Sequence, residues 1–305
     1  MVLMCRDVAV YQIEEQAVLQ APLLPGLMQK NPCSAAFRMW MKRRYASGTN
    51  TIARQLRGVT FGQGARERIN RATHALSFSD CYWVKEESEQ TSFAQISPYF
   101  APFWDGSEDF AGQAAPTLYV GGALSKEWKR DGRLYKYGLV DIELACIALC
   151  EACGIAVEKA VYVPGGIAIT NITSPELMLE QADMSGRLDP EEFDERDVLE
   201  LFGLSGAQML LIDAIVGNGD RHAGNFGWLR DSRTGAYTGM APLYDFDHAL
   251  DATGTDDRLL TDAVNCCRKD YAAEIVRIAG IAAEAPNEVF RRRARGVLAM
   301  MEEER

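Results

Sequence analysis

Apolar residues recur at helical spacing in several stretches of the chain, and these stretches predict its main helices. Over residues 141–153 the apolar positions follow a period of about 3.6 residues, and the pattern stops at Gly154. Over residues 204–216 nearly every position is apolar, which predicts a buried helix that stops at Gly217. The sequence Asp-Pro-Glu-Glu at 189–192 combines a capping aspartate, an early proline and acids, and it predicts a further helix start.

Short β-prone runs lie beside turn signals and predict strands. Residues 117–120 form such a run before Gly121 and Gly122, and residues 133–137 follow an Asp-Gly turn. Further runs cover 156–163 and a hairpin with its turn at 231–235. The patterns predict an α+β protein in three segments. These are a mostly helical segment 1–112, a small sheet-containing segment 113–165 and a mainly helical segment 166–305.

Charge is distributed unevenly over an otherwise ordinary globular composition. The 305 residues are 48% hydrophobic and 25% charged, with a net charge of −11. The segment 30–71 alone carries ten Lys or Arg and one acid, a charge of +9. It could dock on the acidic remainder of the chain, bind an acidic partner or contact nucleic acid. Nucleic acid is not expected as a direct ligand, because the net charge is negative and no zinc-finger or recognition-helix pattern is present.

Hydrophobicity and cysteine spacing indicate the compartment. The longest apolar stretch, roughly 138–157, is interrupted by three acids, and the first residues lack the apolar core of a signal peptide. The eight cysteines have neither disulfide-framework nor zinc-ligand spacing, so we expect them to be reduced. The sequence therefore predicts a cytoplasmic protein that does not bind membranes.

Polar residues that suit phosphoryl transfer follow the predicted buried helix. Asp220 and Asn225 lie five residues apart in a glycine-containing loop, and Asp245 comes after the predicted hairpin. Phosphoryl transfer needs a carboxylate near the acceptor hydroxyl and oxygen ligands for magnesium. We therefore expect Asp220 to be the base, or to orient the acceptor, and Asn225 and Asp245 to be the Mg²⁺ ligands.

Candidates for nucleotide binding precede this loop. Lys136, on the strand after the glycine pair, would contact the α- and β-phosphates of ATP, and Glu143 in the next helix would hold it. Gly121 and Gly122 would let backbone amides approach the phosphates. Lys126 either binds phosphate as well or is a solvated surface lysine.

These motifs together resemble a known family. Asp-Arg-His-Ala-Gly-Asn at 220–225, followed by Leu-Tyr-Asp at 243–245, resembles the active-site signature of HipA-like kinases. Gly-Ala-Leu-Ser-Lys at 122–126 is similar to the phosphate loop of that family, and Leu-Tyr-Lys at 134–136 to its strand lysine. The helix 143–154 matches as well, so the resemblance covers about residues 117–250. The same Asp-Arg-His-x-x-Asn order occurs in phosphatidylinositol 3-/4-kinases.

The resemblance implies a bilobal protein-kinase-like fold. Its small β-containing N-lobe would be 113–165 and its helical C-lobe 166–305, after an N-terminal mostly helical extension. It further implies ATP- and Mg²⁺-dependent transfer to Ser or Thr of a protein, in a toxin-like role with an antitoxin or regulator as a partner. In this family His222 would brace the loop and the metal segment, and Ser125 is a candidate for autophosphorylation, with a plain loop serine as the alternative. No role is assigned to His248.

Two other functions fit the same residues. A small-molecule or phosphoinositide kinase would keep the site and change the acceptor, although the acidic net charge disfavours anionic lipid. A non-catalytic module would use the kinase scaffold and the basic segment to hold a partner.

Overall fold

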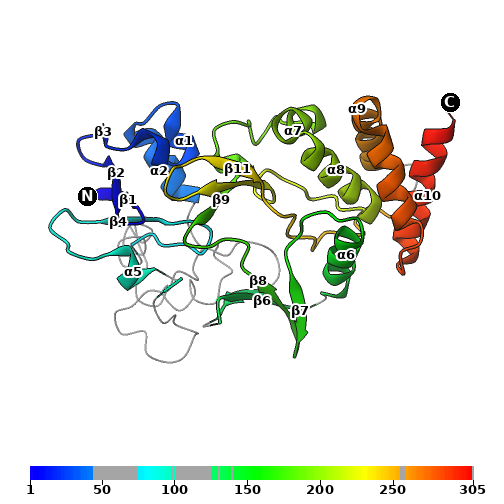
Figure 1. Cartoon of the computed structure of the whole chain (residues 1–305), viewed down its shortest axis with the longest axis horizontal. Coiled ribbons are helices and arrows are strands. Elements are labelled where there is room, and N and C mark those ends of the chain that lie inside the picture. The colour runs from blue at the N-terminus through cyan, green and yellow to red at the C-terminus, as the bar shows by residue number, and fades with distance from the viewer. Residues whose placement is uncertain are drawn as a thin grey trace. The chain divides into compact units, whose positions relative to one another are not determined.

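The computed structural model describes residues 1–43, 74–97, 99–100, 125–129, 131–138, 140–254 and 258–303 (Figure 1). Its residues cluster into two compact units. Unit 1 comprises Met1–Gly138, Val161–Arg187 and Trp228–Thr238, and unit 2 comprises Leu139–Ala160, Leu188–Gly227 and Gly239–Arg305. Each unit is assembled from three separate pieces of chain. The contiguous domain boundaries expected from the sequence therefore stay predictions.

Unit 1 begins with a four-stranded antiparallel sheet in the order β3-β2-β1-β4. The strands are β1 (Val2–Cys5), β2 (Val8–Gln12), β3 (Ala17–Val18) and β4 (Tyr82–Lys85). The helices beside them are η1 (Ala21–Leu23), α1 (Gly26–Gln29), α2 (Ser34–Arg43) and α5 (Phe93–Ile96). The described part of 1–112 thus contains both helices and strands, and the expectation of a mostly helical extension stays a prediction. All four residues of β1 are buried, so this strand lacks the alternation that marks one exposed face.

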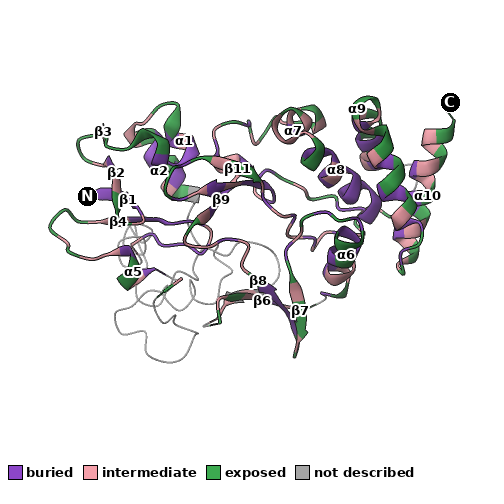
Figure 2. Ribbon diagram, viewed as in Figure 1, coloured by how far each residue is buried: buried purple, intermediate pink, exposed green. Residues whose placement is uncertain are grey.

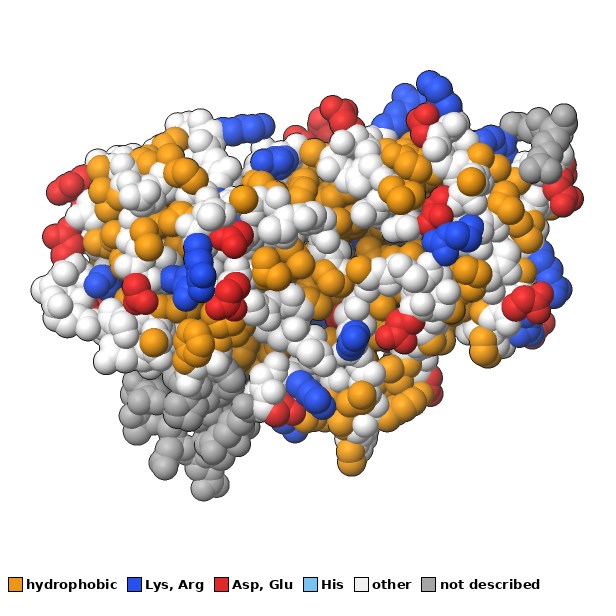
Figure 3. Space-filling view, in the orientation of Figure 1, with side chains coloured by type: hydrophobic (Ala, Val, Ile, Leu, Met, Phe, Trp, Pro, Cys, Tyr) orange, Lys and Arg blue, Asp and Glu red, His pale blue; other side chains and the backbone are white. Residues whose placement is uncertain are grey.

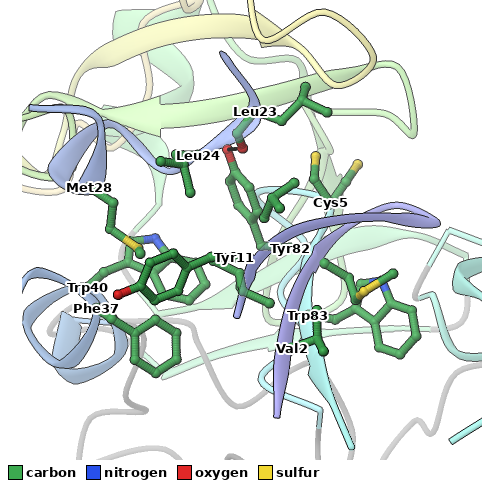
Figure 4. Packing of buried hydrophobic residues seen from close by; sticks show 14 of the residues in the cluster. Val2, Cys5, Tyr11, Leu23, Leu24, Met28, Phe37, Trp40, Tyr82 and Trp83 are labelled. Atoms are coloured by element: carbon green, nitrogen blue, oxygen red, sulfur yellow. Dashed lines mark hydrogen bonds between the residues drawn. The ribbon is translucent and has the colours of Figure 1, made fainter. Parts of the chain in front are cut away.

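Aromatic side chains fill the core between this sheet and the helices (Figure 4). Tyr11 and Phe37 lie with their ring centroids 6.2 Å apart, and Trp40 meets Tyr82 edge-on at 5.6 Å. Figure 4 shows Tyr11, Phe37 and Trp40 grouped together beside Met28. Such offset and edge-to-face contacts add to the stabilisation that burial of the rings already provides.

Two further sheets belong largely to unit 1. The second has the order β5-β6-β8-β7, and the third has the order β11-β10-β9. Figure 2 shows β8 buried along most of its length. The strands are β5 (Ser125–Trp128), β6 (Arg133–Tyr137), β7 (Ala160–Val163), β8 (Gly166–Thr170), β9 (Leu177–Gln181), β10 (Gly227–Asp231) and β11 (Tyr237–Met240).

Arg230 on β10 is fully buried and connects the third sheet to the first. Its guanidinium donates to Glu180 at 2.8 Å, to the Tyr82 hydroxyl at 3.0 Å and to the carbonyl of Leu24 at 2.8 Å. A buried charge is tolerated only when its donors are satisfied and it is paired, and here both conditions are met.

Two helices of unit 2 lie where the sequence predicts them. α6 (Asp141–Ala152) and α8 (Leu204–Val216) match the predicted stretches, and α8 is mostly buried. The prediction of a helix start at 189–192 is wrong, because Asp189 instead accepts from the Glu191 amide in a local turn. The helix α7 (Glu195–Phe202) begins later, where Asp194 and Asp197 form a reciprocal capping box. The remaining helices are α9 (Arg258–Ala282) and α10 (Glu288–Glu302), and α8 packs against both of them (Figure 1).

The strand predictions are confirmed where they fall on described residues, with shifted ends. β6 covers 133–137 as expected, β7 covers only the second half of 156–163, and β10 and β11 form the expected hairpin. The predicted strand 117–120 lies outside the described residues, as does most of the basic segment. Figure 3 shows acidic and basic side chains interspersed over the face in view. Among the described helices, none has the length and apolar character needed to cross a bilayer.

Candidate active site

The loop with the predicted catalytic residues begins where α8 ends. Gly217 takes a left-handed conformation, with φ 69° and ψ 38°, and the Asn218 amide donates to the Asp213 carbonyl. Two backbone hydrogen bonds then tie this helix end to a later segment: Leu250 N–H to the Val216 carbonyl at 2.9 Å, and Ala252 N–H to the Gly217 carbonyl at 3.1 Å. The start of the loop is therefore fixed by backbone contacts.

Gly217→Ala is expected to destabilise the fold. An added Cβ would lie 1.9 Å from the Ala252 carbonyl oxygen, and the left-handed φ adds strain for any L side chain. We expect a loss of about 3 kcal/mol or more in the free energy of unfolding, measured by denaturant titration. Gly280→Ala in the last turn of α9 is the matched control, because nothing lies within 4 Å of its added Cβ. That variant should be unchanged or more stable by up to about 1 kcal/mol. Equal stability of the two variants would contradict the prediction.

Within the loop, local hydrogen bonds fix Asp220 and Asn225 relative to each other. The Asp220 carbonyl accepts from the His222 amide at 2.9 Å and from Nδ2 of Asn225 at 3.4 Å. Asn225 is 9% exposed, and its Nδ2 faces back into the loop, so its Oδ1 is the atom that can ligate a cation. The side chain of Asp220 is half exposed, as a group that meets a substrate hydroxyl must be.

His222 braces the loop through its own neighbours. Its Nδ1 accepts from the Gly224 amide at 3.0 Å, and its carbonyl accepts from the Asn225 amide at 2.8 Å. The sequence led us to expect that His222 would also brace the metal segment. The structure instead makes that link through Tyr244, whose hydroxyl donates to the Gly224 carbonyl at 3.1 Å, and through Arg221.

Asp245 lies in a constrained backbone position. Its φ is +61°, a conformation that non-glycine residues adopt seldom and that is concentrated at functional sites. Its amide donates to Oε1 of Glu158 at 3.2 Å, and Leu243, two residues earlier, pairs with Val157 in a parallel bridge. These contacts fix the backbone from which the carboxylate projects.

Arg221 holds the two candidate metal-ligand segments together. Its Nη1 donates to the Asn225 carbonyl at 2.9 Å and to the Tyr244 carbonyl at 2.7 Å. The other side of the guanidinium forms a two-point contact with Asp213 of α8, with Nε to Oδ2 at 2.8 Å and Nη2 to Oδ1 at 2.9 Å. Burial lowers the pKa of Arg221, but the Asp213 carboxylate together with Tyr244 and Asp245 raises it more, so the pKa lies above its ordinary value. Arg221 is therefore charged, buried and fixed between the helix and both segments.

Sequence reasoning missed Arg221 and Asp213. The signal for Asp213 was present, because it is the one acid in an otherwise apolar predicted helix, and a buried acid requires a partner. Nothing in the sequence distinguished Arg221 from a solvated loop arginine. Its role depends on carbonyl groups that the fold brings to it.

Some of the predicted nucleotide-binding residues lie outside the described part of the chain. Gly121 and Gly122 fall outside the described residues, and Ser125 is the first residue of β5, opposite Tyr137. Lys126 and Lys136 are direct partners across β5 and β6, so both side chains project from the same face of that sheet.

Glu143 is a buried residue in the first turn of α6. Its pairing with Lys136 stays a prediction. Among the described residues, no group of three or more His, Cys, Asp or Glu is arranged to hold a metal.

Comparison with known proteins identifies the fold. No protein-family model matches the chain, and no curated protein matches its sequence. The solved HipA of Shewanella oneidensis MR-1, seen with HipB and operator DNA, matches at a TM-score of 0.58 and 12% identity. The match covers 99% of this chain and 96% of that one. The chain has a HipA-like kinase fold. A Helicobacter pylori proinflammatory kinase, CtkA, matches 60% of this chain and 89% of its own at 18% identity and a TM-score of 0.39.

The HipA-like fold confirms the resemblance found in the sequence and the α+β class. The buried helix predicted directly before the Asp-Arg-His loop is α8. The bilobal arrangement stays a prediction.

Proposed function

We propose that this protein is an ATP- and Mg²⁺-dependent kinase that transfers the γ-phosphoryl group to a serine or threonine of a protein. One observation carries the proposal. A single buried guanidinium, that of Arg221, binds the backbone of Asn225 and the backbone next to Asp245. Two oxygen ligands are thereby held on one scaffold beside Asp220.

The donor set fits magnesium. A carboxamide oxygen from Asn225 and a carboxylate from Asp245 are hard oxygen ligands of the kind that Mg²⁺ prefers. When bound there, the ion would neutralise charge on the phosphate oxygens of ATP. The chain itself contributes the fixed ligand geometry, through Arg221 on one side and Glu158 on the other.

Asp220 would orient the acceptor hydroxyl and accept its proton. In the transfer, the hydroxyl oxygen forms a bond to the γ-phosphorus, and the bond from this phosphorus to the β–γ bridging oxygen breaks. ADP leaves, and the hydroxyl proton passes to the Asp220 carboxylate. Because the transition state is loose, orientation of the hydroxyl contributes more than strong basicity.

Unit 1 supplies positive charge for phosphate. Lys126 and Lys136 lie opposite each other on one face of the second sheet, so two positive charges lie near one another there. We propose that Lys136 contacts the α- and β-phosphates, with Glu143 holding it.

A protein partner forms part of the proposal. The Shewanella HipA is seen with HipB and operator DNA, which supports an antitoxin or regulator for this chain as well. Nucleic acid would then be reached through that partner.

The test is incubation of the full chain with γ-labelled ATP, with Mg²⁺ or with EDTA, followed by intact mass. Label on the protein, or on an added protein acceptor, is expected with Mg²⁺ and should disappear with EDTA. Label that goes only to phosphoinositide vesicles would refute the protein acceptor. Absence of both nucleotide binding and transfer would favour the non-catalytic module.

A further inference from the structure

His248 lies between two carboxylates, one of which belongs to the proposed active site. Its Nδ1 is 2.9 Å from Oδ2 of Asp251, and its Nε2 is 3.7 Å from Oδ2 of Asp220. All three side chains are about half exposed, with relative exposures of 41% for His248, 52% for Asp220 and 53% for Asp251. The imidazole therefore connects the acceptor-side carboxylate to a second carboxylate that has no other assigned role.

Backbone contacts, and not the histidine, place these three residues together. The bonds from Leu250 and Ala252 to the end of α8 fix the segment around Asp251 next to the start of the loop. An added Cβ at Gly219 would lie 3.5 Å from Cβ of Asp251, so the two segments are in van der Waals reach beside Asp220. Substitution of His248 should thus leave the local fold intact.

Helix α10 also secures the same segment. Arg292 donates to the Thr253 carbonyl at 2.7 Å, and Arg293 donates to the carbonyls of Gly254 and Ala214. These bonds also involve only backbone acceptors. Neither Asp251 nor His248 is needed for them.

The surroundings of His248 favour its protonated form. A neutral imidazole can donate from Nδ1 to Asp251, but only the imidazolium also carries a positive charge that attracts the Asp220 carboxylate 3.7 Å from Nε2. The hydrogen bond to Asp251 raises the pKa of His248 above its ordinary value of 6.5, burial opposes this, and Asp247, Asp220 and Asp251 add to the rise through their charges. Among the described residues, these acids are the charged groups that act on the ring.

We propose that His248, oriented by Asp251, is a positioning residue that fixes the Asp220 carboxylate for phosphoryl transfer. The inference rests on the proposed function, because it assigns Asp220 to the acceptor hydroxyl. The imidazolium Nε2 lies 3.7 Å from Oδ2 of Asp220, an ion-pair distance, and the other carboxylate oxygen remains for the incoming hydroxyl. A charge-assisted contact of this kind restrains rotation of a half-exposed carboxylate.

The pH dependence follows from the protonated ring. The pKa of His248 is raised, so the contact is fully formed below pH 6.5 and is lost as the pH rises through the higher pKa of the folded protein. The rate of phosphoryl transfer should therefore fall as the pH rises through the pKa of His248. This fall is the alkaline limb of the pH profile. Asp251→Asn, which removes the group that raises this pKa most, should move the limb to lower pH.

The experiment compares His248→Gln, His248→Ala and Asp251→Asn with the wild type, using Mg·ATP as the probe. Phosphate release and autophosphorylation are measured against pH and ATP concentration. We expect His248→Ala to lower kcat about tenfold with an unchanged KM for ATP, and His248→Gln to lose less, because its amide still donates. Both variants should lack the alkaline limb. His74→Gln is the matched control and should keep it, because His74 lies in unit 1 and bonds the Val84 carbonyl.

The outcomes separate this inference from the proposed function. A wild type that neither releases nor transfers phosphate overturns the proposed function, and this inference with it. An active wild type with unchanged kcat and an unchanged alkaline limb in both His248 variants overturns the role of His248 alone. Melting temperatures equal to that of the wild type confirm that all variants are folded, as the backbone contacts predict.

Discussion

Asp245→Asn should abolish phosphoryl transfer and leave the protein folded. Asparagine has nearly the same shape and tolerates the left-handed φ of +61° at this position. The contact with Glu158 is made by the backbone amide, so it survives the change. What disappears is the negative charge that would hold Mg²⁺, and we expect a loss on the order of a thousandfold. Intact mass after incubation with ATP and Mg²⁺ measures it directly.

Two further variants show whether that loss is specific. Asp270→Asn changes an exposed acid on α9 and should transfer phosphate as the wild type does. Asp220→Asn should also lose transfer but should keep Mg·ATP binding, because Asp220 is assigned to the acceptor and not to the metal. Full activity of Asp245→Asn would refute the assignment of the metal ligands.

The sequence was sufficient to predict those elements whose signals lie in neighbouring residues. α8 is apolar nearly all round and stops at a glycine that must adopt a left-handed conformation, so both its extent and its end were predictable. The hairpin of β10 and β11 contains a turn in which Asp231 accepts from the Thr234 amide. In these cases neighbouring residues determine the structure.

Prediction failed where two local signals competed or where no local signal existed. At 189–192 the cap-like aspartate forms a turn, because the reciprocal box of Asp194 and Asp197 satisfies more backbone amides. The strand β1 is buried at every position and pairs with β4, about eighty residues away in the chain, so its partner could not be read from its own pattern.

The candidate site likewise contains residues that the sequence indicated and contacts that it did not. The spacing of Asp220, Asn225 and Asp245 was visible because these residues form a linear motif. The contacts that hold them were not visible, because Arg221 binds carbonyl groups and His248 meets Asp220 only after the chain has returned through the hairpin. The sequence thus indicated the proposed ligands, whereas the residues that position them became apparent only from contacts in the fold.

Arg221→Ala is expected to impair both stability and transfer. The Asp213 side chain is only 3% exposed, so removal of its partner leaves a buried charge uncompensated. Breaking such a pair costs about 3–5 kcal/mol in the free energy of unfolding. The carbonyls of Asn225 and Tyr244 lose their donor at the same time. Denaturant unfolding measures the first effect, and phosphate transfer per folded molecule measures the second.

Arg221→Lys separates positioning from stability. A lysine keeps the positive charge beside Asp213, so the loss of stability should be smaller, about 1–2 kcal/mol. A single ammonium cannot form the two-point contact with Asp213 and also reach two carbonyls, because it lacks the planar fork of donors. Transfer by the folded variant should therefore fall about a hundredfold, since small displacements of ligands cost much in rate. If folded Arg221→Lys transferred phosphate at the wild-type rate, Arg221 would serve only the stability of α8 and its loop, and the alignment of Asn225 with Asp245 would have to come from Tyr244 and Glu158.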